Sequence, residues 1–189
     1  GEPWLDHDER YRRSAEFLQV LRALFTQDDV EFAGDFYRIR DYTLKPRPFK
    51  APELFQGGTS TAARSNGGRY ADWYFTNGGS VEELRDQIAE VRSHAEAAGR
   101  ETKIGVNAFV IVGDTEAEAQ DRLRDIVAHA DTASVKAFQK SVRDAGAATK
   151  DGKGMWANSS LEDLVQYNDG FKTGLIGTCL LYKSDAADE

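Results

Sequence analysis

Helical and strand-like segments alternate along most of the chain, and this alternation limits the folds open to it. The predicted elements, in order, are a helix at 8–25, a hairpin at 30–44, a strand at 53–56, a helix at 61–69, a strand at 72–76, a helix at 81–98, a strand at 103–112 and a helix at 116–130. Strands that alternate with helices form a parallel sheet with the helices outside it. The pattern predicts an α/β fold, either a (β/α)₈ barrel or an open doubly wound sheet.

A glycine pair followed by hydroxyl residues joins the predicted strand at 53–56 to the next helix. Gly57 and Gly58 allow the backbone to come close to an anion, and Thr59 and Ser60 can cap the helix and donate to phosphate oxygens. A helix start also offers unpaired N–H groups and partial positive charge. The segment therefore suits a phosphate, although an ordinary strand-to-helix turn has the same composition.

Polar or glycine-rich residues also follow the other predicted strands. They are Thr76–Gly79 after the second strand and Asn107 towards the end of the third. The carboxyl ends of parallel strands share one edge, where such folds place their ligands. We expect the binding site at that edge.

Composition excludes several classes of function. The 189 residues carry a net charge of −8 with both signs interspersed, which argues against nucleic acid and anionic membrane as partners. The single Cys179 excludes an internal disulfide framework and suggests a reducing, cytoplasmic compartment. His7, His94 and His129 are scattered without metal-ligand spacing, so no metal site is expected.

Residues 131–160 are rich in Ala, Lys, Asp and Gly and are predicted to be an insertion. It would contain a helix at 134–145 and a loop with Trp156. The sequence does not decide whether this insertion is a lid over the site or a solvated excursion. Ser160 would then cap a short helix at 161–167.

The last stretch, 179–189, differs in character from the rest. It resembles translated sequencing-adapter readthrough, apart from Lys183, and we leave it out of the fold prediction as a non-native tail. Cys179 would then not be native.

Several stretches together resemble the bacterial luciferase-like, flavin-dependent monooxygenases. They are Leu5–Tyr11, the helix that ends near Leu24 and Phe25, Phe32–Tyr37, Phe55–Ser60 and Lys103–Asn107. Three more stretches resemble the branch of that family that oxidises dimethyl sulfone. They are Asp72–Gly78, Val106–Ile111 and Asp163–Thr173. The resemblance covers residues 1–178, which we treat as one domain.

The resemblance implies a partial TIM (β/α)₈ barrel, truncated at both ends, that binds FMN as FMNH₂. It further implies O₂ as co-substrate, dimethyl sulfone as the neutral organosulfur substrate, and methanesulfinate and formaldehyde as products. A separate NAD(P)H-dependent FMN reductase would supply the reduced flavin, and the full-length protein would be a homo-oligomer. The fragment by itself would be inactive, because parts of the barrel are missing.

The resemblance also assigns roles to the residues around the glycine turn. Tyr11 matches a family tyrosine that reaches the flavin phosphate, and Gly58, Thr59 and Ser60 match the phosphate-binding turn of the family.

On the flavin and substrate side, the matching positions are Asn77, Asn107 and Phe109. Alkanesulfonate monooxygenases carry a tryptophan, an arginine and a histidine there. The absence of that arginine suits a neutral substrate rather than a sulfonate. No catalytic residue can be assigned, so the flavin would supply the chemistry.

Other functions stay open from the sequence. Within the family, they are an alkanesulfonate monooxygenase, which Asn107 and Phe109 disfavour, and a relative that uses deazaflavin. Outside it, a non-catalytic flavin-binding barrel or a sugar-phosphate isomerase barrel would use the same phosphate turn.

Overall fold

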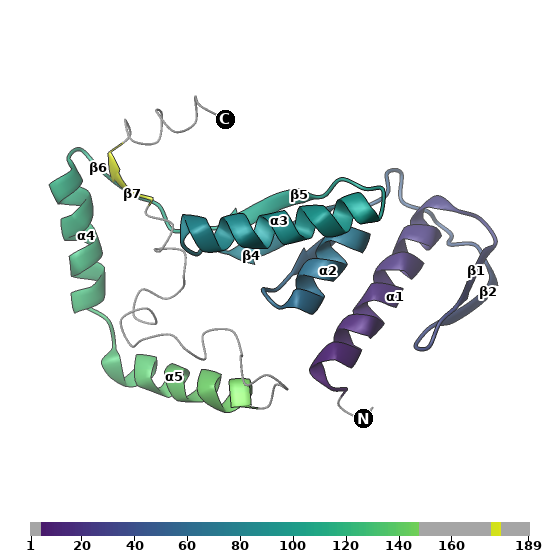
Figure 1. The fold of residues 1–189 in the computed structure, drawn as a ribbon, viewed down its shortest axis with the longest axis horizontal. Helices are drawn as coiled ribbons and strands as arrows, with labels where there is room; N and C mark the ends of the chain where they lie inside the picture. The colour runs from purple at the N-terminus through teal and green to yellow at the C-terminus, as the bar shows by residue number, and fades with distance from the viewer. Residues whose placement is uncertain (1–4, 148–174, 179–189) are drawn as a thin grey trace. The chain divides into compact units, whose positions relative to one another are not determined.

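The structure is a computed structural model that describes residues 5–147 and 175–178 (Figure 1). The described chain forms two compact units. The first comprises residues up to 76 together with 86–105, and the second comprises 77–85 and the residues from 106 onward.

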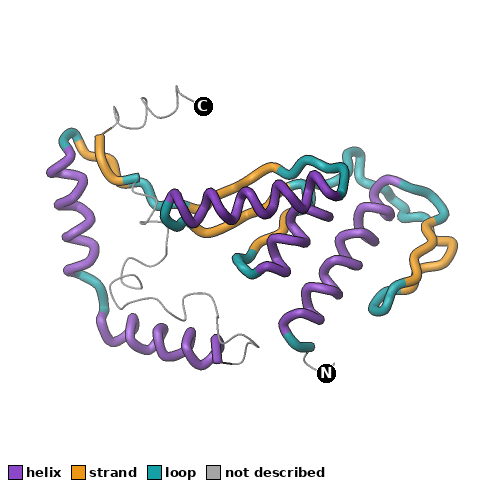
Figure 2. Tube along the Cα trace, in the orientation of Figure 1, coloured by secondary structure: helices purple, strands orange, loops and turns teal. Residues whose placement is uncertain are grey.

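From α1 to α3, the helices and strands follow the order that the sequence predicts (Figure 2). Along the chain the elements are α1 (His7–Thr26), β1 (Val30–Ala33), β2 (Arg38–Tyr42), β3 (Phe55–Gly57), α2 (Thr61–Tyr70), β4 (Trp73–Asn77), α3 (Val81–Ala97), β5 (Lys103–Asn107), β6 (Ile111–Gly113), α4 (Glu116–Ala128), α5 (Thr132–Ala147) and β7 (Ile176–Thr178). The predicted helix at 161–167, Trp156 and the tail at 179–189 lie outside the described residues.

The central sheet has the order β3-β4-β5, and β3 runs parallel to β4 with Phe55 opposite Trp73. Side chains alternate along β4, where Tyr74 and Thr76 are buried and Phe75 is 44% exposed. Alternation of this kind gives the sheet a covered face and an open face. Tyr74 lies on the face covered by α2, whereas Phe55 and Trp73 stack on each other with ring centroids 5.5 Å apart.

Two glycines inside α2 allow this close packing. A β-carbon added to Gly67 would meet the Tyr74 ring at 2.7 Å, and one added to Gly68 would meet the backbone of α3 at Val91. Glycine costs a helix interior about 1 kcal/mol relative to alanine. Here that cost is offset because α2 can approach both the sheet and α3, and Ala63 and Val91 become fully buried.

The predicted hairpin at 30–44 is confirmed, with β1 and β2 antiparallel. Glu16 of α1 holds its turn, because the carboxylate accepts the backbone N–H groups of Asp35, Phe36 and Tyr37 at 2.8, 2.9 and 3.1 Å. Burial raises the pKa of Glu16, but these three hydrogen bonds outweigh it and the pKa lies below its usual range.

The prediction of one strand over 103–112, covered on both faces, is wrong. The segment forms β5 and β6, with residues 108–110 between them, and Val106 and Val110 are 39% and 55% exposed. β5 lies next to β4, whereas β6 pairs in parallel with β7, so Ile111 lies opposite Ile176. A continuous apolar run shows that its residues favour strands, but it does not show which strands they will pair with.

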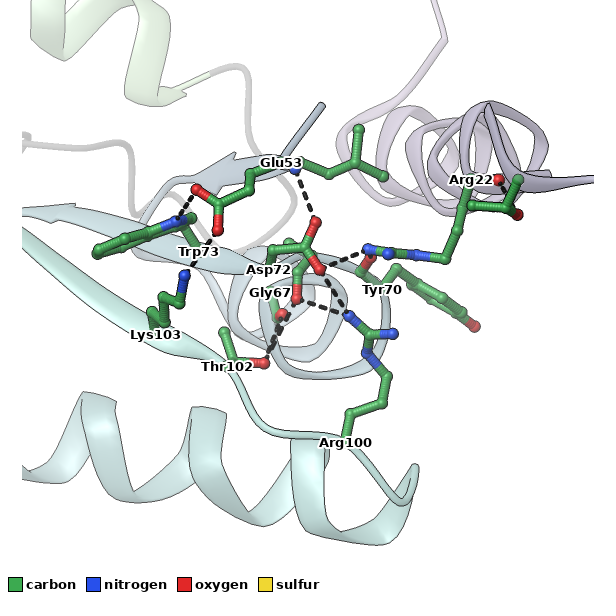
Figure 3. Close-up of polar contacts among 12 residues, drawn as sticks. Arg22, Glu53, Gly67, Tyr70, Asp72, Trp73, Arg100, Thr102 and Lys103 are labelled. Carbon is green, nitrogen blue, oxygen red and sulfur yellow. Dashed lines mark hydrogen bonds and ion pairs between the residues drawn. The ribbon is translucent and has the colours of Figure 1, made fainter. Parts of the chain in front are cut away.

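Asp72, which precedes β4, joins several elements through one carboxylate (Figure 3). Its Oδ1 accepts hydrogen bonds from Arg22 of α1 at 2.8 Å and from Arg100, just before β5, at 3.3 Å. Its Oδ2 accepts the Leu54 N–H, just before β3, at 2.9 Å. The amino-terminal ends of the strands are therefore tied to one another and to α1.

The same arginines also satisfy the end of α2. Arg22 donates to the Tyr70 carbonyl and Arg100 to the Ala71 carbonyl, each at 3.2 Å. These cations thus lie at the negative end of the helix dipole, where they are favourable. Burial raises the pKa of Asp72, but the Leu54 and Arg22 hydrogen bonds and the arginine charges outweigh it, and the pKa is lowered.

A second polar group, formed by Glu53 and Lys103, lies beside the Trp73 ring (Figure 3). Glu53 pairs with Lys103 at 2.6 Å and accepts the Trp73 indole N–H at 3.0 Å. The Lys103 ammonium also lies 5.0 Å from the centre of the Trp73 ring. β3, β4 and β5 are thus joined by side chains at their amino ends as well as by backbone hydrogen bonds.

Replacing Asp72 with Asn should lower the free energy of unfolding at pH 7 by about 1–3 kcal/mol, because two guanidinium groups lose their carboxylate. The folded-state pKa of Asp72 is lowered, so its stabilisation is complete above the unfolded-state value of 3.8 and is lost as the pH falls below it. Urea denaturation at pH 7 and pH 3 should therefore show a smaller acid loss in the variant than in the wild type.

Asp121→Asn is the matched control. Asp121 pairs with Arg124, but their side chains are 69% and 67% exposed, so its loss should be less than about 1 kcal/mol. If both variants lost the same stability, Asp72 would hold no special place in the fold.

Candidate functional site

The turn between β3 and α2 is built around Gly58. Its φ of +117° lies in a region that side chains with a β-carbon rarely adopt. A β-carbon added there would also meet the Tyr11 hydroxyl at 2.8 Å and the Ala63 β-carbon at 3.0 Å. Glycine is therefore required at this position both for its backbone conformation and for the space around it.

The structure brings Tyr11 to this turn from a distant part of the sequence. Tyr11 lies in α1, and the Asn66 side-chain amide of α2 donates to its backbone carbonyl at 2.8 Å. Its ring lies 4.9 Å from that of His7, and its hydroxyl has no hydrogen-bond partner within the described chain. The hydroxyl is therefore available to a ligand at the Gly58 turn.

Thr59 and Ser60 follow the carboxyl end of β3 and begin α2. Ser60 is the N-cap, and its Oγ accepts the Ala63 N–H at 3.2 Å, which leaves its own proton free to be donated. Neither the Thr59 nor the Ser60 backbone N–H has a partner among the residues that the structure describes. Two amides, two hydroxyls and a helix N-terminus thus gather where an anion can bind.

Two residues that the sequence analysis did not single out also contact this turn. The Tyr74 hydroxyl donates to the Gly58 carbonyl at 2.8 Å, and Arg64 donates to the Thr59 carbonyl and, at 3.2 Å, to the Thr61 hydroxyl. The alternation of β4 could have indicated that Tyr74 is buried. No sequence signal indicates which carbonyl it would meet.

The predicted flavin-side and substrate-side residues form a separate group in the second unit. Asn77 ends β4 and Asn107 ends β5, and the Gly78 N–H donates to the Asn107 carbonyl at 2.7 Å. Phe109 follows β5 and is 38% exposed. The ends of the two strands therefore meet at Asn107, and both carry uncharged amide side chains.

The described residues hold no other obvious reactive centre. Within 5–147 and 175–178, no group of three or more His, Cys, Asp or Glu side chains could hold a metal ion. Among the described helices, none combines the length and the apolar content needed to cross a membrane. The chemistry that the described chain supports best is anion binding at the Gly58 turn.

Comparison with known proteins identifies the family. The family described as "Luciferase-like monooxygenase" matches residues 1–179. The chain belongs to the luciferase-like monooxygenases. The resemblance drawn from the sequence is confirmed at this level.

Relatives of this luciferase-like chain include two curated proteins. One, from Pseudomonas putida, is named "FMNH(2)-dependent dimethylsulfone monooxygenase" and is 58% identical over 180 residues, which cover 94% of this chain and 50% of that protein. A protein of the same name from Pseudomonas fluorescens (strain Pf0-1) is 56% identical over 178 residues, covering 94% and 49%. The chain thus spans about half the length of the curated relatives it matches.

A solved structure supports the fold of this luciferase-like chain. The crystal structure of DmoA from Hyphomicrobium sulfonivorans superposes with a TM-score of 0.57 at 24% identity, over 71% of this chain and 34% of that one. The mixed α/β structure, with its small parallel sheets, is part of a TIM (β/α)₈ barrel. Of the two architectures that the sequence left open, the barrel is the correct one.

Gly58→Ala should lower the free energy of unfolding by about 1–3 kcal/mol, through its positive φ and its contact with Tyr11. Gly99→Ala is the matched control, because Gly99 also has a positive φ of +64° but has nothing within 4 Å of an added β-carbon. Thermal and urea denaturation should show the larger loss at Gly58.

The Tyr11→Phe background tests the contact itself, since it removes the hydroxyl that the new β-carbon would meet. It should recover part of the loss at Gly58 and none of the loss at Gly99. Equal losses at both glycines in both backgrounds would mean that Tyr11 does not lie against the turn.

Proposed function

We propose that the whole protein is an FMNH₂-dependent monooxygenase that oxidises dimethyl sulfone. The observation that carries the proposal is the donor set at the Gly58 turn, where the hydroxyls of Tyr11, Thr59 and Ser60 and two unpaired amides surround the start of α2. These groups fit the phosphate of FMN, since helix starts with unpaired N–H groups bind phosphate. The names of the relatives from Pseudomonas support the choice of cofactor and substrate.

The proposed reaction consumes one molecule each of dimethyl sulfone, O₂ and FMNH₂. It gives methanesulfinic acid, formaldehyde, water and FMN, so that one carbon–sulfur bond breaks and both oxygen atoms of O₂ are accounted for. When bound, the reduced flavin supplies the electrons and activates O₂. The described residues of this chain would anchor the phosphate and orient the flavin.

The substrate side of the proposal rests on Asn77 and Asn107. Amide side chains can donate to sulfone oxygens without adding charge, whereas an arginine would favour an anionic sulfonate. Phe109, two residues after Asn107, would add apolar surface for the methyl groups of the substrate. These residues would therefore favour a small neutral substrate.

The reduced cofactor implies a partner. In this proposal a separate NAD(P)H-dependent FMN reductase supplies FMNH₂ in the cytoplasm, and the whole protein is a homo-oligomer. Residues 131–160 would be an insertion in a single barrel domain that extends to residue 178, and 179–189 would be a non-native tail.

Turnover by the whole protein tests the reaction. With FMNH₂ and O₂, dimethyl sulfone should give formaldehyde and methanesulfinate in equal amounts, whereas methanesulfonate should give neither. Turnover of methanesulfonate alone would instead identify a sulfonate monooxygenase. Binding of FMNH₂ without turnover of either compound would indicate a flavin-binding protein that is not an oxygenase for these substrates.

Replacing Thr59 and Ser60 together with Ala should raise the dissociation constant of FMNH₂ about 100-fold or more. The reason is that hydrogen bonds to a charged group contribute about 1.5–3 kcal/mol each. Anaerobic fluorescence titration of the whole protein measures this. Unchanged affinity would show that the phosphate binds elsewhere.

Thr115→Ala provides the matched control for the loss of a helix cap. Thr115 caps α4 and accepts the Glu118 N–H at 3.2 Å, the same distance as the Ser60 cap, but it lies in the second unit. This variant should lose similar stability and keep its affinity for FMNH₂.

A further inference from the structure

We propose that Tyr74 and Arg64 are positioning residues, which hold two successive carbonyls of the β3–α2 turn so that the Thr59 and Ser60 amides face the phosphate of the flavin. This inference rests on the proposed function, because it concerns the same phosphate site. It adds two side chains that would not themselves touch the ligand. Together we call them the carbonyl clamp.

Tyr74 holds the first carbonyl from the covered face of the sheet. Its side chain is fully buried, at 0% exposure, and its hydroxyl donates to the Gly58 carbonyl at 2.8 Å. In a planar trans peptide the C=O and the next N–H point in opposite directions. Fixing the Gly58 carbonyl on Tyr74 therefore directs the Thr59 N–H away from the sheet core.

Arg64 holds the second carbonyl from within α2. Its Nη1 donates to the Thr59 carbonyl, and its Nε pairs with Glu90 of α3 at 2.7 Å. The same peptide geometry then directs the Ser60 N–H away from the guanidinium. Because the clamp takes up both carbonyls, their partial negative charges are kept away from the bound anion, and both amides remain free to donate.

A face of α3 supports both members of the clamp. The Gln87 side-chain oxygen lies 3.4 Å from the Tyr74 hydroxyl and 3.3 Å from the Thr76 hydroxyl. Glu90, three residues further on, pairs with Arg64 and lies 3.8 Å from His94. Since residues three apart lie on one side of a helix, α3 backs the turn through Gln87 and Glu90 together.

Tyr74 acts as a donor at any pH at which the protein would work. Burial raises the pKa of its phenol, so the hydroxyl keeps its proton well above neutral pH. Glu90 balances the charge of Arg64, so Arg64 serves mainly to fix the geometry of the turn. The clamp should therefore strengthen phosphate binding by orienting the Thr59 and Ser60 amides, and not by adding positive charge.

Comparing the affinities for FMNH₂ and reduced riboflavin distinguishes the clamp from a general effect on folding, because riboflavin has the ring of FMN and lacks the phosphate. In the whole protein, Tyr74→Phe should raise the dissociation constant of FMNH₂ about tenfold and that of reduced riboflavin less than twofold. About 1.4 kcal/mol corresponds to this tenfold change, which is close to the lower end of the contribution of one hydrogen bond to a charged group. Anaerobic titration of both flavins with the same protein preparations gives the comparison.

Tyr42→Phe is the matched control, since Tyr42 is 48% exposed on β2 and lies opposite Val30 of β1. It should change neither affinity.

Arg64→Lys is a second, independent test, because lysine keeps the charge but loses the forked geometry that holds the Thr59 carbonyl and Glu90 together. Arg64→Lys should also weaken the binding of FMNH₂ more than the binding of reduced riboflavin. If Tyr74→Phe does not fold, the result with Arg64→Lys tests the clamp by itself.

The clamp would be overturned if a folded Tyr74→Phe or Arg64→Lys variant bound both flavins equally more weakly, or bound both as tightly as the wild type. Either result would leave the proposed function standing. A wild-type protein that binds the two flavins equally would have no phosphate site, and the proposed function would fall together with the clamp. The wild-type measurement thus distinguishes the two failures.

Discussion

The Asp72 carboxylate is the contact on which the arrangement of the first unit depends. Through Arg22, Arg100 and the Leu54 N–H it joins α1, the segment before β5 and the start of β3. Each of these groups would be costly to leave unpaired in a partly buried position. Because they converge on one side chain, the amino ends of the strands are joined to one another and to α1.

The carboxyl end of β3 has a different role from the amino end. Here the backbone turns at Gly58, and the Tyr11 hydroxyl and the Thr59 and Ser60 amides have no hydrogen-bond partner among the described residues. Stability and binding are thus placed at opposite ends of the same strand, as is usual in barrels built from parallel strands. The close packing that Gly67 and Gly68 permit keeps α2, whose start forms the site, firmly against the sheet.

Most of the element order could be predicted from the sequence, because helical spacing, capping residues and short apolar runs are local signals. The N-cap Ser60 is an example. The division of 103–112 into β5 and β6 could not be predicted, since it depends on which strands lie beside each half. The turn at Gly57–Ser60 was visible as a pattern, and the resemblance to the family added Tyr11. The contacts of Tyr74 and Arg64 join residues far apart or on different elements, and only the folded arrangement reveals them.

The attachment of the β1–β2 hairpin has a consequence for how the molecule responds to acid. One carboxylate, Glu16, accepts three backbone N–H groups of the hairpin turn, and they lower its pKa. Protonation of that single group places a proton on one of its two acceptor oxygens and weakens the three hydrogen bonds together, as the pH falls below the usual range for glutamate. The hairpin is therefore a part of the first unit that acid below this range should loosen locally.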